Sequence, residues 1–474
     1  MEMVEADFTV IGSGPAGQKG AIQAAKIGKK VVVIDRDPNL GGACLHHGTI
    51  PSKTLREAVL DLTSFQERSY YGKDHDDNRI ISIHDLNFRL TKVIMHQQAV
   101  VERQMTKNNI QIIVGSAEFV DRHMIRVLDE DGETLCMVRT EHALIATGSS
   151  PRQPLNIEFD KDTIMDSDQL LQLHHVPKSL MVLGGGIIGC EYATMFAALG
   201  TKVILIDKAP KPMGFVDGGI LEHFMQYAQG MGMELKFGEE IVEIGKTNEN
   251  VAFVKLANDE EITSECLFVA LGRQANTKNL GLERIGLELS SRGYIQVNSM
   301  FQTAVPHIYA AGDVIGIPSL AATSMEQGRL AARNAFALKS RPFPEFFPYG
   351  IYTIPEISSV GPTEEELKAK DINYQVGLAY YYEIGRGPIN GDDKGLIKII
   401  FHAETLEVLA VHIIGTGATE LIHIGQLAID FHARVNYFVE QVFNYPTFAE
   451  GYRIAALNGI NKLTGKKVPA GWMS

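Results

Sequence analysis

The stretch that decides the fold is "DFTVIGSGPAGQKGAIQAAKIGKKVVVID", Asp7–Asp35. Two apolar runs of strand length flank an alanine-rich run, and a glycine turn joins the first apolar run to it. This order predicts a strand, a helix and a second strand, which together form a βαβ unit. The turn carries Gly12, Gly14 and Gly17 in the spacing G-x-G-x-x-G. The first glycine permits a tight turn, the second lets a diphosphate approach and the third allows close packing, so the turn predicts a dinucleotide site.

The same pattern returns in "SLMVLGGGIIGCEYATMFAALGTKVILID". Gly184, Gly186 and Gly189 repeat the glycine spacing, and Asp207 repeats Asp35 at the end of the second strand run. Each acid is the expected acceptor for a ribose hydroxyl, and each helix N-terminus directs its positive end at the diphosphate. Two dinucleotides in one chain usually mean a resident flavin and a visiting nicotinamide, between which hydride passes. The repeat therefore predicts two nucleotide-binding domains of related design.

Other segments extend this organisation. The segments "ALIATGSSPRQP", with Gly148, and "CLFVALGRQANT", with Gly272, follow the two copies in turn. The apolar run "HIYAAGDV", which ends near Asp313, needs a sheet to join. The Pro- and Phe-rich "RPFPEFFPYGIYTIPE" predicts a linker, and a mixed α/β segment runs from about Tyr349 to the end. We therefore predict an α/β fold with two Rossmann-like dinucleotide-binding domains and an α+β C-terminal domain.

Composition excludes several classes of function. The formal net charge of -13 disfavours phosphodiester backbones, and we find no basic patch, so we expect no nucleic-acid partner. Cys44, Cys136, Cys190 and Cys266 are scattered without metal-ligand spacing, so we expect no metal and a reducing compartment. No run approaches 18 apolar residues and no leader pattern precedes the first strand. We expect a cytoplasmic protein without a membrane partner.

The order of the motifs resembles a known family. "GSGPAG", "GGACLHHGTIPSK", "ATGSSPR", "GGGIIGCEYA", "ALGRQANT", "AAGDV" and "NYPTFAEGYRIAALNGINKL" occur in the order seen in pyridine nucleotide-disulfide oxidoreductases. The resemblance covers nearly the whole chain. It implies an FAD-binding domain at 1–150 and 277–347, an NAD(P)-binding domain at 151–276, and a C-terminal dimerisation domain at 348–474. It also implies a homodimer or a larger homo-oligomer.

The resemblance carries the family's site onto particular residues. Lys53 and Glu191 would form an ion pair near flavin N5, where hydride arrives. The catalytic group would comprise Lys53, Glu191, Thr49 and Tyr445. The residues that bind FAD or NAD(P)(H) would be Gly12, Gly14, Gly17, Asp35, Gly42, Cys44, Lys53, Gly148, Gly184, Gly186, Gly189, Glu191, Asp207, Lys208, Gly272 and Asp313.

The sequence departs from the disulfide reductases of this family at two positions. Thr49 stands where the second, flavin-side cysteine would follow Cys44, and Tyr445 stands where a base histidine would precede Pro446. A disulfide needs two sulfur atoms, so a dithiol relay cannot operate. Tyrosine, with an ordinary pKa near ~10, is a poor proton acceptor at neutral pH. Glu450 remains at the position of the partner acid.

Electrons on the flavin therefore need another exit. The simplest exit is the nicotinamide site itself: NADPH delivers hydride to FAD, and NAD+ then takes it from the same site in a ping-pong cycle. "GTIPSK" and "NYPT" resemble the Si-specific transhydrogenase branch of the family. Asp207 alone favours NAD(H), because it repels a 2′-phosphate, whereas the neighbouring Lys208 and Lys211 offer compensating charge.

Two alternatives stay open. A flavin without its dithiol can discharge to small acceptors, which would make the protein an NAD(P)H-dependent quinone or oxygen reductase. A flavoprotein with only a binding role is the second alternative, although passive binding gives no reason for an ion pair of Lys53 and Glu191 beside N5. Cys44 needs no redox role in either case, and we expect it to be a packed small residue.

Overall fold

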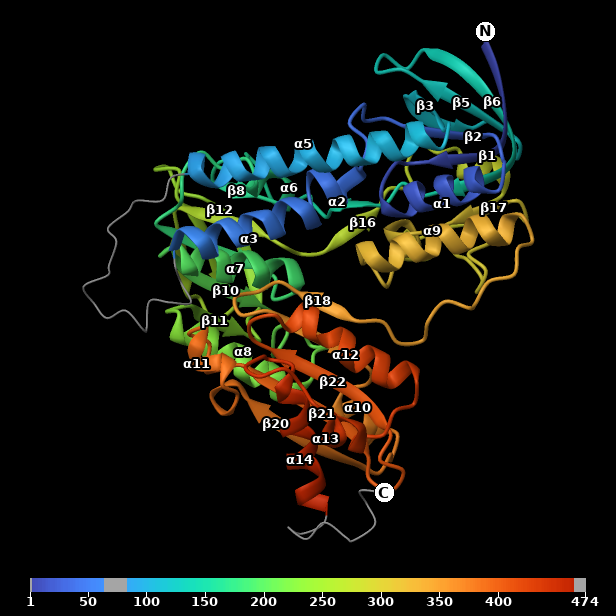
Figure 1. Ribbon diagram of the computed structural model, residues 1–474. Helices are drawn as coiled ribbons and strands as arrows, with labels where there is room; N and C mark the ends of the chain where they lie inside the picture. Colours follow the sequence, from blue (N-terminus) through green and yellow to red (C-terminus); the bar gives the residue numbers. More distant parts are fainter. Residues whose placement is uncertain (1, 64–82, 464–474) are drawn as a thin grey trace.

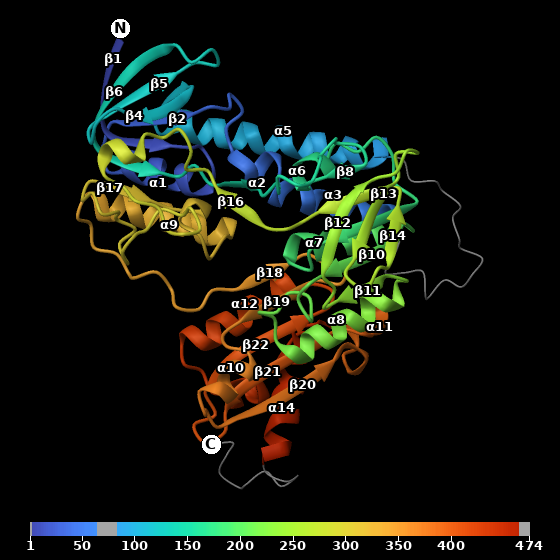
Figure 2. The ribbon, with the colours of Figure 1, turned by 180° about the vertical axis from the view of Figure 1, so that it is seen from behind.

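The computed structural model describes residues 2–63 and 83–463 (Figure 1). A unit built on the N-terminal sheet lies at one end and a unit built on the C-terminal sheet lies at the other. A third unit lies between them beside the long helix α5 (Ile83–Lys107). Figure 2 shows the same order from behind. The units are therefore stacked in an order that brings the middle unit into contact with both of the others.

The N-terminal unit contains the first βαβ repeat. Its sheet has the order β3-β2-β1-β6-β5-β4, and β17 pairs with the C-terminal part of β6. β1 pairs in parallel with both β2 and β6, and α1 packs against α9. The predicted strand "HIYAAGDV" joins this sheet as β17. The elements are β1 (Glu2–Ile11), α1 (Pro15–Lys26), β2 (Val31–Asp35), α2 (Gly42–His46), α3 (Thr49–Thr63), α5, β3 (Gln111–Val114), β4 (Ser116–Phe119), β5 (Met124–Leu128), β6 (Thr134–Ile145), η2 (Leu282–Ile285), β17 (Ile308–Ala310), η3 (Asp313–Ile315) and α9 (Ala321–Ala335).

The middle unit contains the second repeat. Its parallel sheet has the order β11-β10-β9-β15-β8, and β12, β13 and β14 form an antiparallel sheet beside it. The chain enters and leaves this unit through β7 and β16, which pair antiparallel with each other. The elements are β7 (Ser149–Pro151), β8 (Ile164–Met165), α6 (Ser167–Leu170), β9 (Ser179–Leu183), α7 (Ile187–Ala198), β10 (Lys202–Asp207), α8 (Gly218–Gly230), β11 (Glu234–Phe237), β12 (Ile241–Lys246), β13 (Ala252–Leu256), β14 (Glu261–Ser264), β15 (Cys266–Val269) and β16 (Arg273–Ala275).

The C-terminal unit is an antiparallel sheet covered by helices. Its strand order is β18-β19-β22-β21-β20, and α12 and α14 pack against it. The buried strand run "LIKIIFH" places Lys398 inside the sheet, at 3% exposure. The elements are β18 (Tyr349–Ile351), β19 (Ile357–Val360), α10 (Glu364–Ala369), β20 (Tyr374–Tyr380), η4 (Tyr381–Glu383), α11 (Arg386–Ile389), β21 (Leu396–His402), β22 (Val408–Ile414), α12 (Ala418–Asp430), α13 (Asn436–Glu440) and α14 (Glu450–Leu463).

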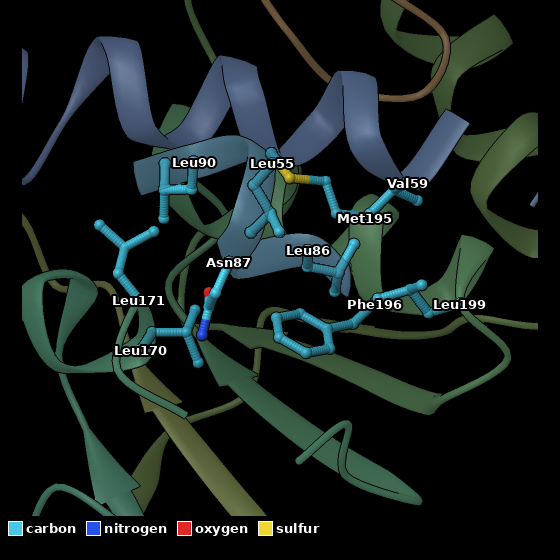
Figure 3. A pocket seen from close by; sticks show the side chains of 10 residues that line it. All are labelled: Leu55, Val59, Leu86, Asn87, Leu90, Leu170, Leu171, Met195, Phe196 and Leu199. Atoms are coloured by element: carbon cyan, nitrogen blue, oxygen red, sulfur yellow. The ribbon is translucent and has the colours of Figure 1, made fainter. Parts of the chain in front are cut away.

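An apolar seam joins the first two units. Side chains from α3 and from the start of α5 point toward side chains of α6 and α7 (Figure 3). Leu55, Val59, Met195 and Phe196 are among them, and the cavity that they leave is only about 10 Å³. Because a void of this size has room for one water at most, α3 and α7 are closely packed against each other.

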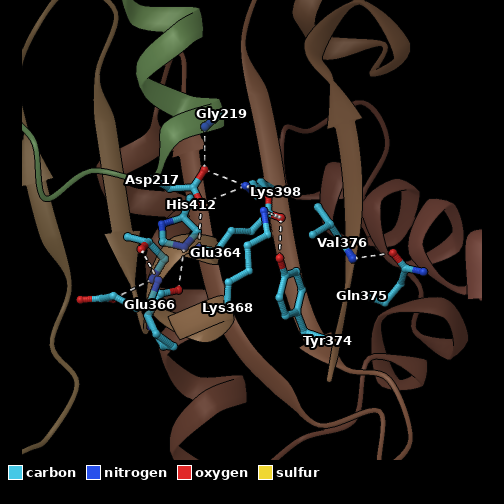
Figure 4. A network of polar contacts seen from close by, with 12 residues as sticks. Asp217, Gly219, Glu364, Glu366, Lys368, Tyr374, Gln375, Val376, Lys398 and His412 are labelled. Atoms are coloured by element: carbon cyan, nitrogen blue, oxygen red, sulfur yellow. Dashed lines mark hydrogen bonds and ion pairs between the residues drawn. The ribbon is translucent and has the colours of Figure 1, made fainter. Parts of the chain in front are cut away.

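A buried ion cluster joins the middle unit to the C-terminal unit (Figure 4). The Lys398 Nζ atom donates to both carboxylate oxygens of Asp217, at 2.7 and 2.9 Å, and to Glu364 Oε2 at 2.5 Å. Asp217 caps α8 through the Gly219 amide at 3.0 Å. The neighbouring His412 donates from Nε2 to the Pro362 carbonyl oxygen at 3.1 Å. The start of α8 is thereby tied to the C-terminal sheet.

The ion cluster makes stability depend on pH. Burial acts to raise the pKa of Asp217, but the neighbouring His412 and Lys398 outweigh burial, so this pKa is lowered. Burial also acts to raise the pKa of Glu364, but the hydrogen bond with Lys398 outweighs it and lowers this pKa. Burial lowers the pKa of His412. Each group binds fewer protons in the folded state, so its contribution is complete above its unfolded pKa and is lost as pH falls through its folded value. We expect the urea midpoint of unfolding to decrease as the pH is lowered below about 6.5, and to decrease further below about pH 4.5. The fall below about pH 4.5 should be smaller in Glu364→Gln, and a wild-type midpoint that stays flat down to pH 3 would contradict the assignment.

Candidate functional site

The glycines of both turns divide into packed and open positions. A Cβ atom at Gly12 would lie 2.4 Å from the Ala146 carbonyl oxygen, and one at Gly17 would lie 1.9 Å from the Gly12 carbonyl oxygen. A Cβ atom at Gly14 would meet no atom within 4 Å. The second turn repeats this pattern, with Gly184 and Gly189 packed and Gly186 open. The first and third glycines are therefore required by the fold, and the second leaves space beside the backbone.

Two helices begin at these open positions. Gly14 is the N-cap residue of α1 and Gly186 is the N-cap residue of α7, and neither offers a side-chain cap. The free amide groups in the first turn of each helix therefore have no side-chain cap, and the positive end of each helix dipole lies beside an open glycine position. An anionic diphosphate fits both places, because backbone N–H groups can bind it and no Cβ atom blocks its approach.

The two strand-end acids bind the turns themselves. The Asp35 carboxylate accepts from the Ser13 amide at 2.6 Å and from the Asp37 amide at 3.0 Å. Asp207 repeats this arrangement, since it accepts from the Gly185 amide at 2.5 Å and from the Ala209 amide at 2.8 Å. Each acid has a structural role that the glycine motif alone did not predict.

The segment after β2 returns to the first turn. Gly42 has a φ of +62° and packs so closely on Gly14 that a Cβ atom would lie 2.8 Å from the Gly14 Cα atom. The Gly41 amide donates to Ser13 Oγ at 3.0 Å. These contacts place the start of α2, and then α3, beside the first turn.

Cys44 and Thr49 lie next to each other across the α2–α3 junction. Burial raises the pKa of the Cys44 thiol and outweighs the opposing hydrogen bond with Thr49. A protonated thiol beside a hydroxyl is a poor nucleophile. Cys190 is fully buried, and burial raises its pKa as well.

Lys53 and Glu191 form an ion pair between the N-terminal and the middle unit. The Lys53 Nζ atom lies 2.6 Å from Glu191 Oε2, and the two side chains are 24% and 4% exposed. Lys53 comes from α3 and Glu191 from α7, so each belongs to a helix that starts near one of the turns. The Glu191 Oε1 atom accepts from the Tyr352 amide at 2.8 Å. The ion pair predicted from sequence is present, and Tyr352 is a partner that sequence reasoning missed.

Asp313 is hydrogen-bonded to β7, which pairs with β16 where the chain passes between the first two units. The Ser149 hydroxyl donates to Asp313 Oδ2 at 2.6 Å, and Arg273 Nε donates to Ser149 Oγ at 2.8 Å. Gly148 and Gly272 have φ values of +69° and +95° and lie directly before β7 and β16. Ser149 and Arg273 were also missed, although both stand in the motifs that follow the two repeats.

Two expected site residues are exposed. Lys208 is exposed after β10. Tyr445 is 75% exposed between α13 and α14, and a Cβ atom at Gly385 would lie 2.8 Å from its hydroxyl oxygen. Figure 1 shows these helices in the C-terminal unit, away from α3. A single chain therefore does not bring Tyr445 to Lys53 and Glu191.

Within residues 2–63 and 83–463, no group of three or more His, Cys, Asp or Glu residues is placed to hold a metal ion. In the same part of the chain, no helix is both long enough and apolar enough to cross a membrane.

Known proteins with similar sequences cover nearly the whole chain. Residues 6–328 match the family model for pyridine nucleotide-disulphide oxidoreductase, and residues 347–456 match the dimerisation domain of that family. The soluble pyridine nucleotide transhydrogenase of Mycobacterium tuberculosis (strain ATCC 25177 / H37Ra) is 46% identical over 463 residues, 97% of this chain and 98% of that protein. The soluble pyridine nucleotide transhydrogenase of Yersinia enterocolitica is 43% identical over 463 residues, 96% of this chain and 98% of that protein.

Solved structures give the same result for the fold. LpdA from Mycobacterium tuberculosis superposes with a TM-score of 0.88 at 25% identity, over 96% of this chain and 99% of that chain. The HOCl-induced flavoprotein disulfide reductase RclA from Escherichia coli superposes with a TM-score of 0.85 at 26% identity, over 95% of this chain and 99% of that chain. Since the family match spans both glycine turns and the relatives, at 43–46% identity, cover nearly the whole chain, the chain belongs to the pyridine nucleotide-disulphide oxidoreductase family.

Proposed function

We propose that this protein is an FAD-dependent pyridine nucleotide transhydrogenase that moves hydride between NADPH and NAD+ without a redox disulfide. The observation that carries the proposal is the Lys53–Glu191 ion pair between two open glycine turns, next to a Cys44–Thr49 pair that has only one sulfur atom. The 46% identical relative named soluble pyridine nucleotide transhydrogenase supports it.

The N-terminal turn holds FAD and the second turn holds the nicotinamide nucleotide. FAD is bound by the α1 N-terminus at Gly14, with Gly42, Gly148 and Asp313 lining the rest of its site. The NAD(P)(H) nucleotide is bound by the α7 N-terminus at Gly186, with Gly272 nearby. FAD-binding residues lie within 1–150 and 277–347, NAD(P)-binding residues within 151–276, and dimerisation residues within 348–474.

The bound FAD supplies a two-electron carrier that can take hydride from one nicotinamide and return it to another. The chain's own contribution is positional and electrostatic. Lys53 keeps a cation where the two helices meet, and Glu191 fixes that cation and balances its charge. The seam of α3 and α7 is closely packed, which fixes the two helices that carry the pair.

Thr49 ends the route to disulfide substrates. Its hydroxyl cannot form a disulfide with Cys44, and Tyr445 replaces the expected base histidine. NAD+ therefore has to bind after NADP+ leaves, which gives a ping-pong cycle, and we assign the Si-specific course to this transfer by family resemblance. The match to the dimerisation domain supports a homodimer or larger assembly, in which Tyr445 approaches the FAD of a second copy. Four free cysteines support a cytoplasmic location.

The proposed function is tested by mixing the purified yellow protein with NADPH and an NAD+ analogue as the only two other reactants. We expect reduction of the analogue, with parallel double-reciprocal lines at several NADPH concentrations. A matched pair of variants separates the two sites. Gly186→Val should retain FAD but should no longer pass hydride from NADPH to the analogue. Gly14→Val should lose FAD. Each substitution adds a side chain to the open space beside one turn. Rapid quinone or oxygen turnover with negligible transfer between nucleotides would refute the proposal.

Lys208 and Lys211 are proposed to admit the 2′-phosphate of NADPH despite Asp207. Lys208 is exposed and Lys211 is partly exposed on the segment that follows β10. In the double variant Lys208→Ala, Lys211→Ala, we expect the KM for NADPH to rise by about 5–30-fold and the KM for NADH to stay within twofold, because only NADPH carries the phosphate. Lys202→Ala, on β10 itself, serves as the control. An unchanged KM for NADPH would discard these lysines.

A further inference from the structure

We propose that Tyr352, from the C-terminal unit of the same chain, is a positioning residue that holds both members of the Lys53–Glu191 pair. This inference rests on the proposed function, because it assigns Tyr352 a part in hydride transfer at that site. Tyr352 lies directly after β18, far from both partners in the sequence.

Tyr352 touches the two charges with different parts of the residue. Its backbone amide donates to Glu191 Oε1 at 2.8 Å. The face of its ring lies below Lys53, whose Nζ atom is 4.8 Å from the ring centroid. Lys53 Nζ also lies 2.6 Å from Glu191 Oε2. The cation is thus held between a carboxylate and an aromatic face, which is a favourable arrangement for an ammonium group.

The backbone of Tyr352 is fixed by the segment that follows it. Arg56 Nε donates to the Thr353 carbonyl oxygen at 3.1 Å, and Thr194 Oγ1 accepts from the Ile354 amide at 3.1 Å. Arg56 lies on α3, three residues after Lys53, and Thr194 lies on α7, three residues after Glu191. The two helices that carry the ion pair therefore also clamp the segment that positions it.

The segment that carries Tyr352 is also tied to α12. Thr419 Oγ1 on α12 donates to Glu356 Oε2 at 2.9 Å, and Glu356 Oε1 lies 3.3 Å from Arg56 Nη1. These contacts run from the C-terminal unit to α3, and they help to fix the segment that carries Tyr352.

The ring matters because Lys53 is not fully enclosed. Its side chain is 24% exposed, so without the ring the flexible stem can turn its ammonium group toward water. A cation–π contact of this kind is worth about 0.5–2 kcal/mol, which corresponds to a change of about 2–30-fold in a rate that depends on the position of the cation. The amide bond to Glu191 would remain, since any residue supplies it.

The test compares Tyr352→Leu, Tyr352→Phe and Tyr349→Leu. Tyr349→Leu is the matched control, because Tyr349 begins β18, three residues before Tyr352, and its ring packs on Phe215 and Phe347. We expect Tyr352→Leu to slow the limiting rate of flavin reduction by NADPH about 2–30-fold with little change in NADPH affinity. It should also shift the flavin midpoint potential to a more negative value, because a cation near the flavin moves away. Tyr352→Phe and Tyr349→Leu should match the wild type in both measurements. If Tyr352→Leu does not retain FAD, Tyr352→Met replaces it.

A double variant adds the decisive comparison. In a Lys53→Met background, Tyr352→Leu should have no further effect on rate or potential, because the ring acts through the cation. Equal slowing with and without Lys53, or a Tyr352→Phe variant as slow as Tyr352→Leu, would overturn the inference. So would a Tyr352→Leu variant that equals the wild type. If the wild type itself fails to reduce its flavin with NADPH, the proposed function fails, and the potential shift still reports on Tyr352.

Discussion

The Lys398→Met variant should lose about 3–5 kcal/mol of unfolding free energy, because it leaves two carboxylates without their shared cation. The side chain of Asp217 is 0% exposed and that of Lys398 is 4% exposed, so water cannot replace the lost contact. Urea unfolding at pH 7, followed by circular dichroism, measures the change. The helix cap at the start of α8 and the contact between the middle and C-terminal units should weaken together.

Lys368→Met is the matched control for this variant. The Lys368 Nζ atom lies 3.6 Å from Oε1 of Glu364, which also binds Lys398, but the Lys368 side chain is 67% exposed. An exposed pair of this kind contributes about 0–1 kcal/mol, so Lys368→Met should change stability little. Adding Asp217→Asn to Lys398→Met should recover part of the loss, because it removes a buried unpaired charge and keeps an oxygen for the cap. Equal effects of Lys398→Met and Lys368→Met would contradict the assigned role of the cluster.

The Lys53→Met variant should reduce the rate of flavin reduction by NADPH about 100–1000-fold, the usual size of losing one preorganised electrostatic group. Glu191, with a side chain only 4% exposed, would be left with the Tyr352 amide and no cation. The variant should still bind FAD, because the first glycine turn is untouched. Stopped-flow absorbance of the flavin band measures the rate.

Lys29→Met provides a control of the same chemistry elsewhere. The Lys29 Nζ atom lies 4.8 Å from the centroid of the Phe336 ring, and no predicted site residue is involved. Its flavin should be reduced at the wild-type rate. If Lys53→Met reduces its flavin as fast as Lys29→Met, the ion pair has no part in hydride transfer.

The glycine turns could be predicted from sequence because their constraints are local. Gly12 and Gly17 contact each other within one turn, and the same contact recurs at Gly184 and Gly189. A short motif therefore specifies the geometry. The strand at Ile308–Ala310 was also predictable, because an apolar run must join a sheet to bury its surface.

The supporting residues could not be predicted in the same way. Tyr352 is 161 positions from Glu191, and Lys398 is 181 positions from Asp217. Such contacts form only when separate units pack together, and a lone tyrosine or lysine in a strand gives no signal of its partner. Asp35 and Asp207 were predicted as ribose acceptors, and their bonds to the turn amides came from the structure. The resemblance to the family identified Lys53 and Glu191, but it did not show what holds them.

The central claim is that electrons leave the flavin of this protein on a second nicotinamide, because Thr49 removes the disulfide route. The most direct measurement reduces the enzyme anaerobically with one equivalent of NADPH in a stopped-flow instrument and then mixes it with NAD+, lipoamide or glutathione disulfide. The account predicts rapid return of the oxidised flavin spectrum with NAD+ and no enzymatic reaction with either disulfide. Rapid reoxidation by a disulfide, with NAD+ inert, would contradict it.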